Sequence, residues 1–108
     1  MEIYKVTEAF SSLSQETRLR VFKFLIEYGA DGAVPGLISS KLKIPANTLS
    51  FHLSHMSGAG LVTSEKNGRS VTYFANTELI EDLIGYLHTN CCAKESKSKT
   101  KCSSKKGC

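Results

Sequence analysis

Apolar residues recur at helical spacing through the first half of the chain. Over residues 2–13 and 15–28 they return every three or four positions, the period that buries one side of a helix. A shorter stretch that starts at Pro35 and a longer one over residues 46–57 keep this period, with Ser14 placed to cap the second helix and Gly29 to end it. The expected buried positions are Ile3, Val6, Phe10 and Leu13; Leu19, Phe22, Leu25 and Ile26; Leu37, Ile38 and Leu42; and Leu49, Leu53 and Met56.

The pattern changes after residue 60. Two β-prone runs, residues 61–65 and 70–74, flank Lys66-Asn67-Gly68-Arg69, and an Asn-Gly pair between such runs is a strong hairpin signal. Helical spacing returns over residues 77–90, carried by Leu79, Ile80, Leu83, Ile84 and Leu87. Adjacent helices followed by a hairpin are typical of a winged helix-turn-helix. The sequence therefore predicts a mainly α fold with one β-hairpin, a winged helix-turn-helix.

Composition divides the chain near residue 90. Residues 1–90 are long enough for one domain, whereas residues 91–108 hold six lysines and one glutamate with almost no apolar side chain. We expect a folded domain over 1–90 and a flexible tail over 91–108. The tail carries +5 and the whole chain +4, so residues 1–90 sum to −1 and the positive charge is concentrated in the tail. The tail lysines either add salt-sensitive attraction to DNA phosphate or keep a flexible end soluble.

The sequence gives no sign of a membrane protein or an enzyme. It lacks a run of about 18 apolar residues and the pattern of a secretory signal, so a cytoplasmic location with reduced thiols is the expectation. No nucleophile stands with a matching base and no glycine-rich loop would bind phosphate, so we expect no enzymatic activity.

All the cysteines lie in the tail, at Cys91, Cys92, Cys102 and Cys108. A cysteine in the folded domain would be an ordinary core residue, but none precedes residue 91. Spare thiols on a flexible end are the plain alternative. Four cysteines in 18 residues against none in 90 favour a dedicated binding site instead.

Two stretches carry recognisable motifs. Residues 13–21 read Leu-Ser-Gln-Glu-Thr-Arg-Leu-Arg-Val, and residues 49–62 include Ser-Phe-His-Leu and Ala-Gly-Leu-Val. With Gly68-Arg69 and Tyr73, they resemble the signature and recognition helix of the ArsR/SmtB family of metal-responsive repressors, over residues 7–90. The resemblance implies a homodimer through the first and last helices, recognition helices in two major grooves of operator DNA, and release on ligand binding. The apolar stripes of both terminal helices support a two-fold interface independently.

The chain departs from the family at its familiar metal sites. Arsenic and cadmium sensors often carry a Cys-x-Cys pair at the start of the third helix, where this sequence has Val34 and Gly36. The zinc site of other members needs Asp-x-His and His-x-x-Glu/His on the last helix, and residues 77–90 lack that spacing. Neither site is expected here.

The tail thiols are therefore the expected ligand site. Trivalent arsenic takes three sulfur ligands in a trigonal pyramid, and the metal-ligand candidates Cys91, Cys92 and Cys102 supply three across a loop that closes at modest entropic cost. Arsenite is the expected inducer, with trivalent antimony as the second choice and no organic cofactor. Cadmium, zinc and monovalent copper stay open, because thiolates bind soft ions generally. Cys108 is not needed for three ligands, although it would complete a tetrahedral set.

The main hypothesis is a repressor that leaves its operator when arsenite binds. A repressor switched by thiol oxidation and a zinc or cadmium sensor are alternatives within the DNA-binding class. A metal-sequestering carrier, in which the helical body only dimerises, is the alternative from another class.

The helix over residues 46–57 is the expected DNA-reading element. With its apolar stripe turned inward, a step of about 100° per residue turns Asn47 and Phe51 outward. Phe51 fits a thymine methyl, whereas for His52 packing and DNA contact are equally open. Arg69 at the hairpin either reaches phosphate or the minor groove, or stays a solvated tip. The candidates for DNA contact are Asn47, Thr48, Ser50, Phe51, His52 and Arg69.

Overall fold

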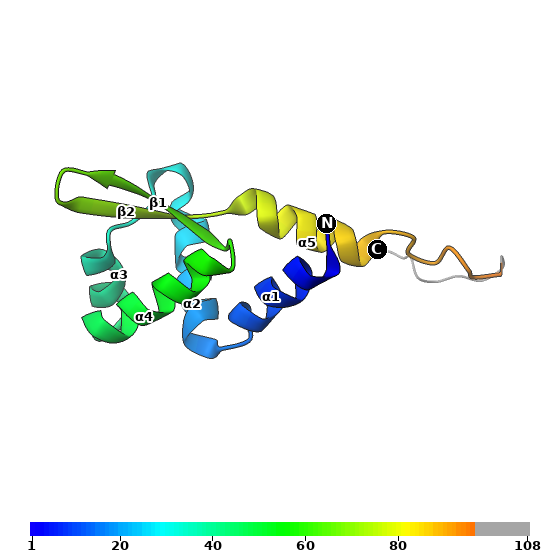
Figure 1. Ribbon diagram of the computed structural model, residues 1–108, viewed down its shortest axis with the longest axis horizontal. Coiled ribbons are helices and arrows are strands. Elements are labelled where there is room, and N and C mark those ends of the chain that lie inside the picture. The colour runs from blue at the N-terminus through cyan, green and yellow to red at the C-terminus, as the bar shows by residue number, and fades with distance from the viewer. Residues whose placement is uncertain (97–108) are drawn as a thin grey trace.

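The computed structural model describes residues 1–96, and its elements follow the predicted order. They are α1 (Ile3–Leu13), α2 (Glu16–Tyr28), a 3-10 turn (Gly29–Asp31), α3 (Pro35–Leu42), α4 (Ala46–Gly58), β1 (Val62–Asn67), β2 (Ser70–Ala75) and α5 (Thr77–His88) (Figure 1). Helices α3 and α4 form the helical pair and the hairpin forms the wing, so the winged helix-turn-helix is confirmed. Most of the expected tail, residues 97–108, lies outside the described part of the chain.

The ends of α2 are set by a side chain at one end and a glycine at the other. The Gln15 side chain accepts a hydrogen bond from the backbone N–H of Arg18 at 3.0 Å, so the cap is Gln15 and the prediction of Ser14 is wrong. The Ser14 hydroxyl instead donates to the Ser11 carbonyl at 2.8 Å, because Ser14 is the residue that caps the C-terminal end of α1. Gly29 ends α2 with a φ of 56°, as predicted.

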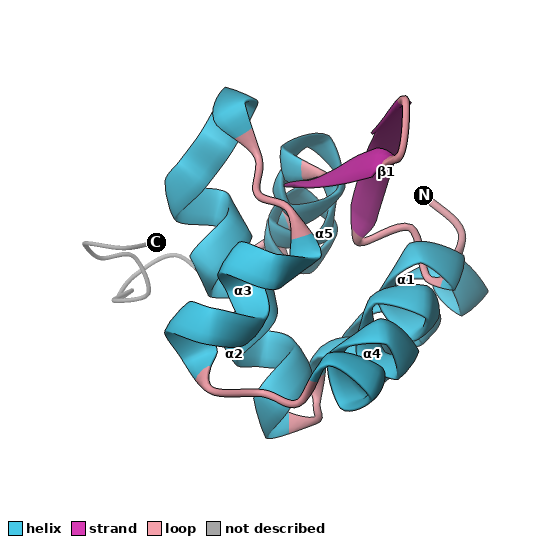
Figure 2. Cartoon of the chain, turned by 90° about the vertical axis from the view of Figure 1, so that its left-hand side faces the viewer, coloured by secondary structure: helices cyan, strands magenta, loops and turns pink. Residues whose placement is uncertain are grey.

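One apolar core lies between the helices and the wing. On α4 the predicted stripe is confirmed, since Leu49, Leu53 and Met56 are all buried. On α2 the prediction is wrong at Leu19, which is 46% exposed, while Val21 is buried in its place. Because α2 packs against α1, α3, α4 and β2, neighbouring elements rather than one stripe decide which of its side chains are covered. Figure 2 shows the helices grouped together with the strands to one side.

The hairpin is tighter than the sequence predicts. Its antiparallel pairs run from Val62 opposite Ala75 to Asn67 opposite Ser70, which leaves only Gly68 and Arg69 in the turn. The strands continue through part of the predicted loop because Gly68, with a φ of 63°, takes the left-handed conformation that a two-residue turn needs. Arg69 is thereby held at the tip of the wing.

The segment before α3 fastens the wing to the helices. Ala33 and Tyr73 exchange two backbone hydrogen bonds, 2.9 and 2.8 Å long. Beside them Gly32 has a φ of 63°, and a Cβ there would stand 2.6 Å from the carbonyl oxygen of Tyr73 and 2.7 Å from the ring of Phe74. Only glycine fits this crossing, which fixes the wing relative to the helical pair.

The terminal helices α1 and α5 leave apolar side chains uncovered. These are Ile3, Tyr4 and Phe10 of α1 and Ile84, Tyr86 and Leu87 of α5. Leu83 of α5 is buried against the core, whereas Ile84, Tyr86 and Leu87, which follow it towards the C-terminal end of the helix, are exposed. None of the described helices has the length and apolar character needed to cross a membrane.

Candidate nucleic-acid interface and thiol site

The outer face of α4 carries the predicted polar and aromatic side chains. Asn47, Thr48, Ser50 and Phe51 are all exposed, and Phe51 is the most unusual of them, with 64% of its surface accessible. The side chain of Asn47 accepts a hydrogen bond from the backbone N–H of Thr48 at 3.0 Å, which steadies the first turn of the helix. This half of α4 presents donors, acceptors and one apolar ring to whatever approaches it.

His52 differs from the other five candidates because it is buried, with 7% of its surface exposed. Its Nδ1 lies 3.3 Å from Nη1 of Arg18. Burial first, and then the charges of Arg18 and His55, lower the pKa of His52 below its usual value of 6.5. A guanidinium only donates, so Nδ1 accepts and the ring proton of neutral His52 sits on Nε2. These contacts support the interpretation that His52 packs in the core rather than against DNA.

The exposed ring of Phe51 rests against this buried histidine. The two ring centroids are 5.5 Å apart at an interplanar angle of 64°, an edge-to-face arrangement. The orientation of Phe51 on the surface therefore depends on the position of His52 beneath it.

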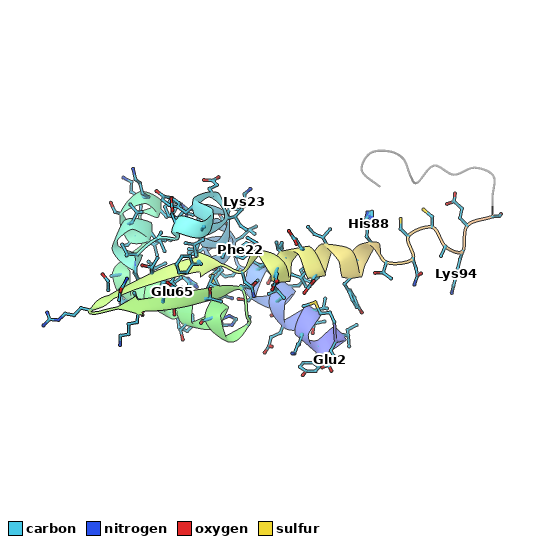
Figure 3. All side chains as sticks on the ribbon, turned by 90° about the horizontal axis from the view of Figure 1, so that it is seen from above. Glu2, Phe22, Lys23, Glu65, His88 and Lys94 are labelled. Atoms are coloured by element: carbon cyan, nitrogen blue, oxygen red, sulfur yellow. The ribbon has the colours of Figure 1, made fainter. Side chains whose placement is uncertain are left out.

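The wing places a second group of polar side chains beyond the helices. Figure 3 shows the hairpin projecting from the helical body, with Glu65 labelled on it. Lys66 and Arg69 are exposed near its tip, and Arg69 occupies the turn itself. A cation at the end of a short hairpin is suited to contact phosphate in an adjacent groove.

A polar network beneath α4 escaped the sequence prediction. The fully buried hydroxyl of Ser12 lies 3.0 Å from Nδ1 of His55, and Nε of Arg18 donates to the carbonyl oxygen of Ser12 at 2.7 Å. Ser12 follows buried Ala9 by one helical turn, which was the only sequence signal that its hydroxyl would need a partner. Arg18 stands in the Thr-Arg-Leu-Arg motif, which gave no indication of what it contacts.

The first two tail cysteines follow α5 after a two-residue link, Thr89-Asn90. Cys91 and Cys92 are exposed, and their Sγ atoms are 3.6 Å apart. Asn90 and Cys92 both have a φ of 62°, so the chain turns sharply here. In Figure 3 this segment lies between the labelled His88 and Lys94, away from the wing. Cys102, the third predicted ligand, lies with Cys108 outside the described residues. Within residues 1–96 no three metal-ligating side chains come together.

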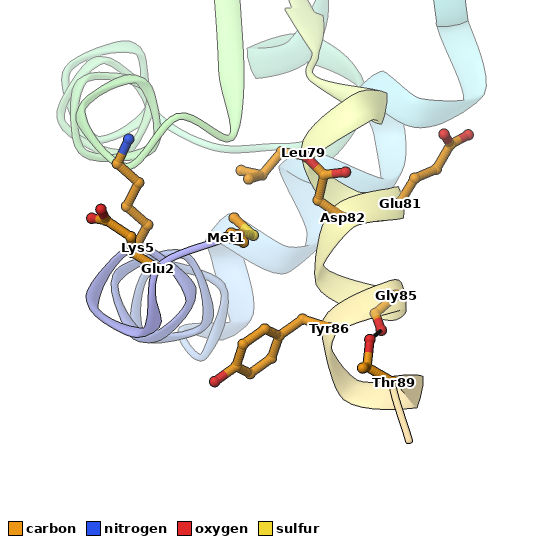
Figure 4. Close-up of a pocket in the computed structure, with 9 residues that line it drawn as sticks. All are labelled: Met1, Glu2, Lys5, Leu79, Glu81, Asp82, Gly85, Tyr86 and Thr89. Atoms are coloured by element: carbon orange, nitrogen blue, oxygen red, sulfur yellow. Dashed lines mark hydrogen bonds between the residues drawn. The ribbon is translucent and has the colours of Figure 1, made fainter. Parts of the chain in front are cut away.

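A groove of about 720 Å³ opens between the start of α1 and the length of α5 (Figure 4). Glu2 and Lys5 line it from α1 and its N-terminal flank, and Asp82 and Tyr86 line it from α5. The two terminal helices therefore do not cover each other, and both keep surface for a further contact.

Comparison with known proteins finds helix-turn-helix transcriptional regulators. A helix-turn-helix domain model matches residues 13–65, from the end of α1 into β1. The uncharacterized HTH-type transcriptional regulator MJ1325 of Methanocaldococcus jannaschii is 33% identical over 85 residues, which cover 78% of this chain and 93% of that protein.

Two solved structures share the fold. An ArsR-like transcriptional regulator from Rhodococcus sp. RHA1 superposes with a TM-score of 0.75 at 22% identity, over 86% of this chain and 85% of that one. The homodimeric winged helix-turn-helix DNA-binding domain of Mb0332 from Mycobacterium bovis superposes with a TM-score of 0.63 at 18% identity, over 90% of each chain.

Proposed function

The chain belongs to the helix-turn-helix transcriptional regulators, and from this premise we propose that it is an ArsR-type repressor released from its operator by trivalent arsenic. The ligands are the thiolates of Cys91, Cys92 and Cys102. The observation that carries the proposal is the pair of sulfur atoms 3.6 Å apart, just beyond a terminal helix with exposed apolar side chains. The protein acts as a cytoplasmic regulator with reduced thiols rather than as an enzyme.

The proposed DNA contacts come from α4 and the wing. Asn47, Thr48, Ser50 and Phe51 are exposed on α4 and have the donors, acceptors and apolar surface that read base edges in a major groove. Arg69 at the wing tip contacts phosphate or the minor groove, as cations beside a recognition helix commonly do. His52 contributes from below by supporting Phe51.

We propose a homodimer as the DNA-binding unit. The support is the exposed apolar surface of α1 and α5, which a second copy of the chain would cover. The Mycobacterium bovis domain with the same fold is described as homodimeric, which agrees with this arrangement. Pairing two chains presents two copies of α4 to successive major grooves on one side of the DNA.

The donor set favours arsenic and antimony among the soft ions. Two sulfurs that share a tetrahedral zinc ion at about 2.3 Å each are about 3.8 Å apart. The 3.6 Å between the two Sγ atoms supports chelation of one soft ion by both residues once both are reduced thiolates. Zinc prefers four ligands, whereas a pyramidal metalloid is complete with three, and the adjacent Cys91-Cys92 pair lacks the spacing of a zinc knuckle. Cys102 supplies the third thiolate in this proposal.

Sensing and release are connected through α5. Cys91 lies three residues after the end of α5. Binding of a metalloid by the thiolates there would therefore constrain the C-terminal end of the proposed dimer helix. Release requires only that the liganded dimer disfavour DNA by about 1–3 kcal/mol, the usual range of coupling between sites.

Fluorescence anisotropy of a labelled inverted-repeat duplex, selected from a random library with the reduced protein, tests the proposal. We expect tight binding that arsenite abolishes. Cys91→Ser, Cys92→Ser and Cys102→Ser should each bind DNA normally and resist arsenite, whereas Cys108→Ser should respond as the original protein does.

The redox-switch and carrier alternatives, and a four-thiolate site, would each give a different result. Release by peroxide without arsenite would establish the redox switch in place of metalloid sensing. Arsenite binding by a protein that selects no duplex would establish the carrier. An equal loss of response in Cys108→Ser would replace the three-thiolate site with a four-thiolate site.

A further inference from the structure

Two polar side chains, Ser12 and His52, are buried in the described part of the core. Ser12 lies on α1 and His52 on α4, so the two helices meet at a polar contact rather than at apolar side chains alone. A buried polar group destabilises the fold unless it is hydrogen-bonded, which ties the positions of both residues to their partners.

Arg18 is the partner that they share. Its Nε donates to the carbonyl oxygen of Ser12 at 2.7 Å, and its Nη1 lies 3.3 Å from Nδ1 of His52. The guanidinium is planar with donors at fixed angles, so these two contacts hold α1 and α4 at a fixed separation from α2. Arg18 itself is anchored at the start of α2, where the Gln15 side chain caps its backbone N–H.

A second bond reinforces the same junction. The Ser12 hydroxyl lies 3.0 Å from Nδ1 of His55, one helical turn beyond His52 on α4. Both histidines of the recognition helix are thus bonded to groups that Arg18 or Ser12 position. The register of α4 along α1 is fixed by these contacts, together with the apolar stripe below.

We propose that Arg18 is a positioning residue for DNA recognition, which sets the register of α4 through His52 and thereby orients Phe51. The inference rests on the proposed DNA-binding function of α4. The step from Arg18 to the surface is short, because Phe51 packs edge-on against the ring that Arg18 contacts. Arg18 acts without contacting DNA, so its loss reduces discrimination between sequences more than attraction to phosphate.

A pair of matched arginine variants tests the proposal by salt-dependent DNA binding. Arg18→Lys keeps the charge but loses the planar fork, and Arg20→Lys makes the same change two residues on, at an exposed arginine. We expect Arg18→Lys to weaken binding to the selected duplex by about tenfold or more, the scale of a hydrogen bond to a charged group. Its affinity for an unrelated duplex and its salt slope should not change, and Arg20→Lys should stay within about twofold of the original protein.

A second pair of variants separates positioning from loss of fold. His52→Gln keeps an acceptor for Arg18, whereas His52→Leu removes it at similar volume. We expect His52→Gln to retain more sequence discrimination than His52→Leu, with circular dichroism and both unfolding midpoints measured alongside. Equal discrimination in these two, or equal effects of Arg18→Lys and Arg20→Lys, would overturn the positioning role alone.

Two further outcomes are informative. A lower salt slope in Arg18→Gln, which removes the charge, than in the original protein would make Arg18 a phosphate contact and reject the positioning role. Failure of the unmodified protein to prefer any duplex would overturn the proposed function together with this inference.

Discussion

His52 is a histidine whose pKa is lowered by folding. Its ring lies in the core beside the Arg18 guanidinium, and His55 stands one turn away on the same helix. Desolvation, followed by electrostatic interaction with Arg18 and with His55, lowers the pKa of His52 in the folded protein. Protonation of this side chain therefore competes with the contact that positions it.

The consequence is a loss of stability on acidification. In the unfolded chain His52 has its ordinary pKa of 6.5, so below that pH the unfolded state binds more protons than the folded state. The free energy of unfolding should fall as the pH drops from 6.5 towards the lower folded pKa. Urea denaturation at about pH 7.5 and about pH 5.5 measures the fall. In His52→Gln, which still has His55 and His88, the fall should be smaller; an unchanged fall would assign it to other groups.

At the scale of elements, α4 and the wing divide the expected recognition between them. Phe51 is an apolar contact on α4, and Arg69 is a cation at the wing tip. Phe51→Ala should lower affinity for the selected duplex while the dependence on salt stays the same. Arg69→Ala should weaken binding to all duplexes and lower the salt slope by about one, because one phosphate contact is lost.

Binding measured from low to high salt on selected and unrelated duplexes checks both effects. Ser54→Ala, a change at another exposed position of α4 outside the candidate set, is the control. If Arg69→Ala leaves the salt slope unchanged, the wing tip is only a solvated turn.

The burial pattern and ends of some elements could be predicted from the sequence, and those of others could not. The α4 stripe of Leu49, Leu53 and Met56 was predicted correctly because one side of that helix faces the core. On α2, Leu19 was misplaced because periodicity gives the spacing of an apolar stripe but not which of its positions a neighbouring element covers. The hairpin was predicted, but its turn was shortened by pairing between strands.

The polar network was beyond prediction from one sequence. Ser12 and His55 are 43 residues apart, and only the packing of α1 against α4 brings them together. Local patterns report which face of a helix is apolar, not which polar groups meet in the folded chain. The tail site rests on sulfur chemistry and on the adjacency of Cys91 and Cys92, which the sequence already displays, and the Cys102 contribution stays a prediction.

For the whole molecule, the exposed apolar side chains of α1 and α5 favour a homodimer. Ile84 is 58% exposed on α5, two turns beyond Thr77 at the start of the same helix. Ile84→Glu should convert a dimer to monomers, because it puts a charge into the proposed interface, whereas Thr77→Glu adds the same charge near the helix N-terminus, where it is tolerated. Sedimentation velocity measures both, and an Ile84→Glu protein with the mass of the original would place the interface elsewhere.

In the proposed function DNA release depends on the tail thiols, and a titration of the protein–operator complex measures this dependence most directly. Reduced protein bound to labelled operator is titrated in parallel with arsenite, zinc and cadmium, with Cys91→Ser as the control. We expect arsenite to release the DNA as it binds, zinc and cadmium to do so weakly, and Cys91→Ser to stay bound. Retention of the operator at saturating arsenite, with arsenite bound to the protein, would contradict arsenic-controlled repression.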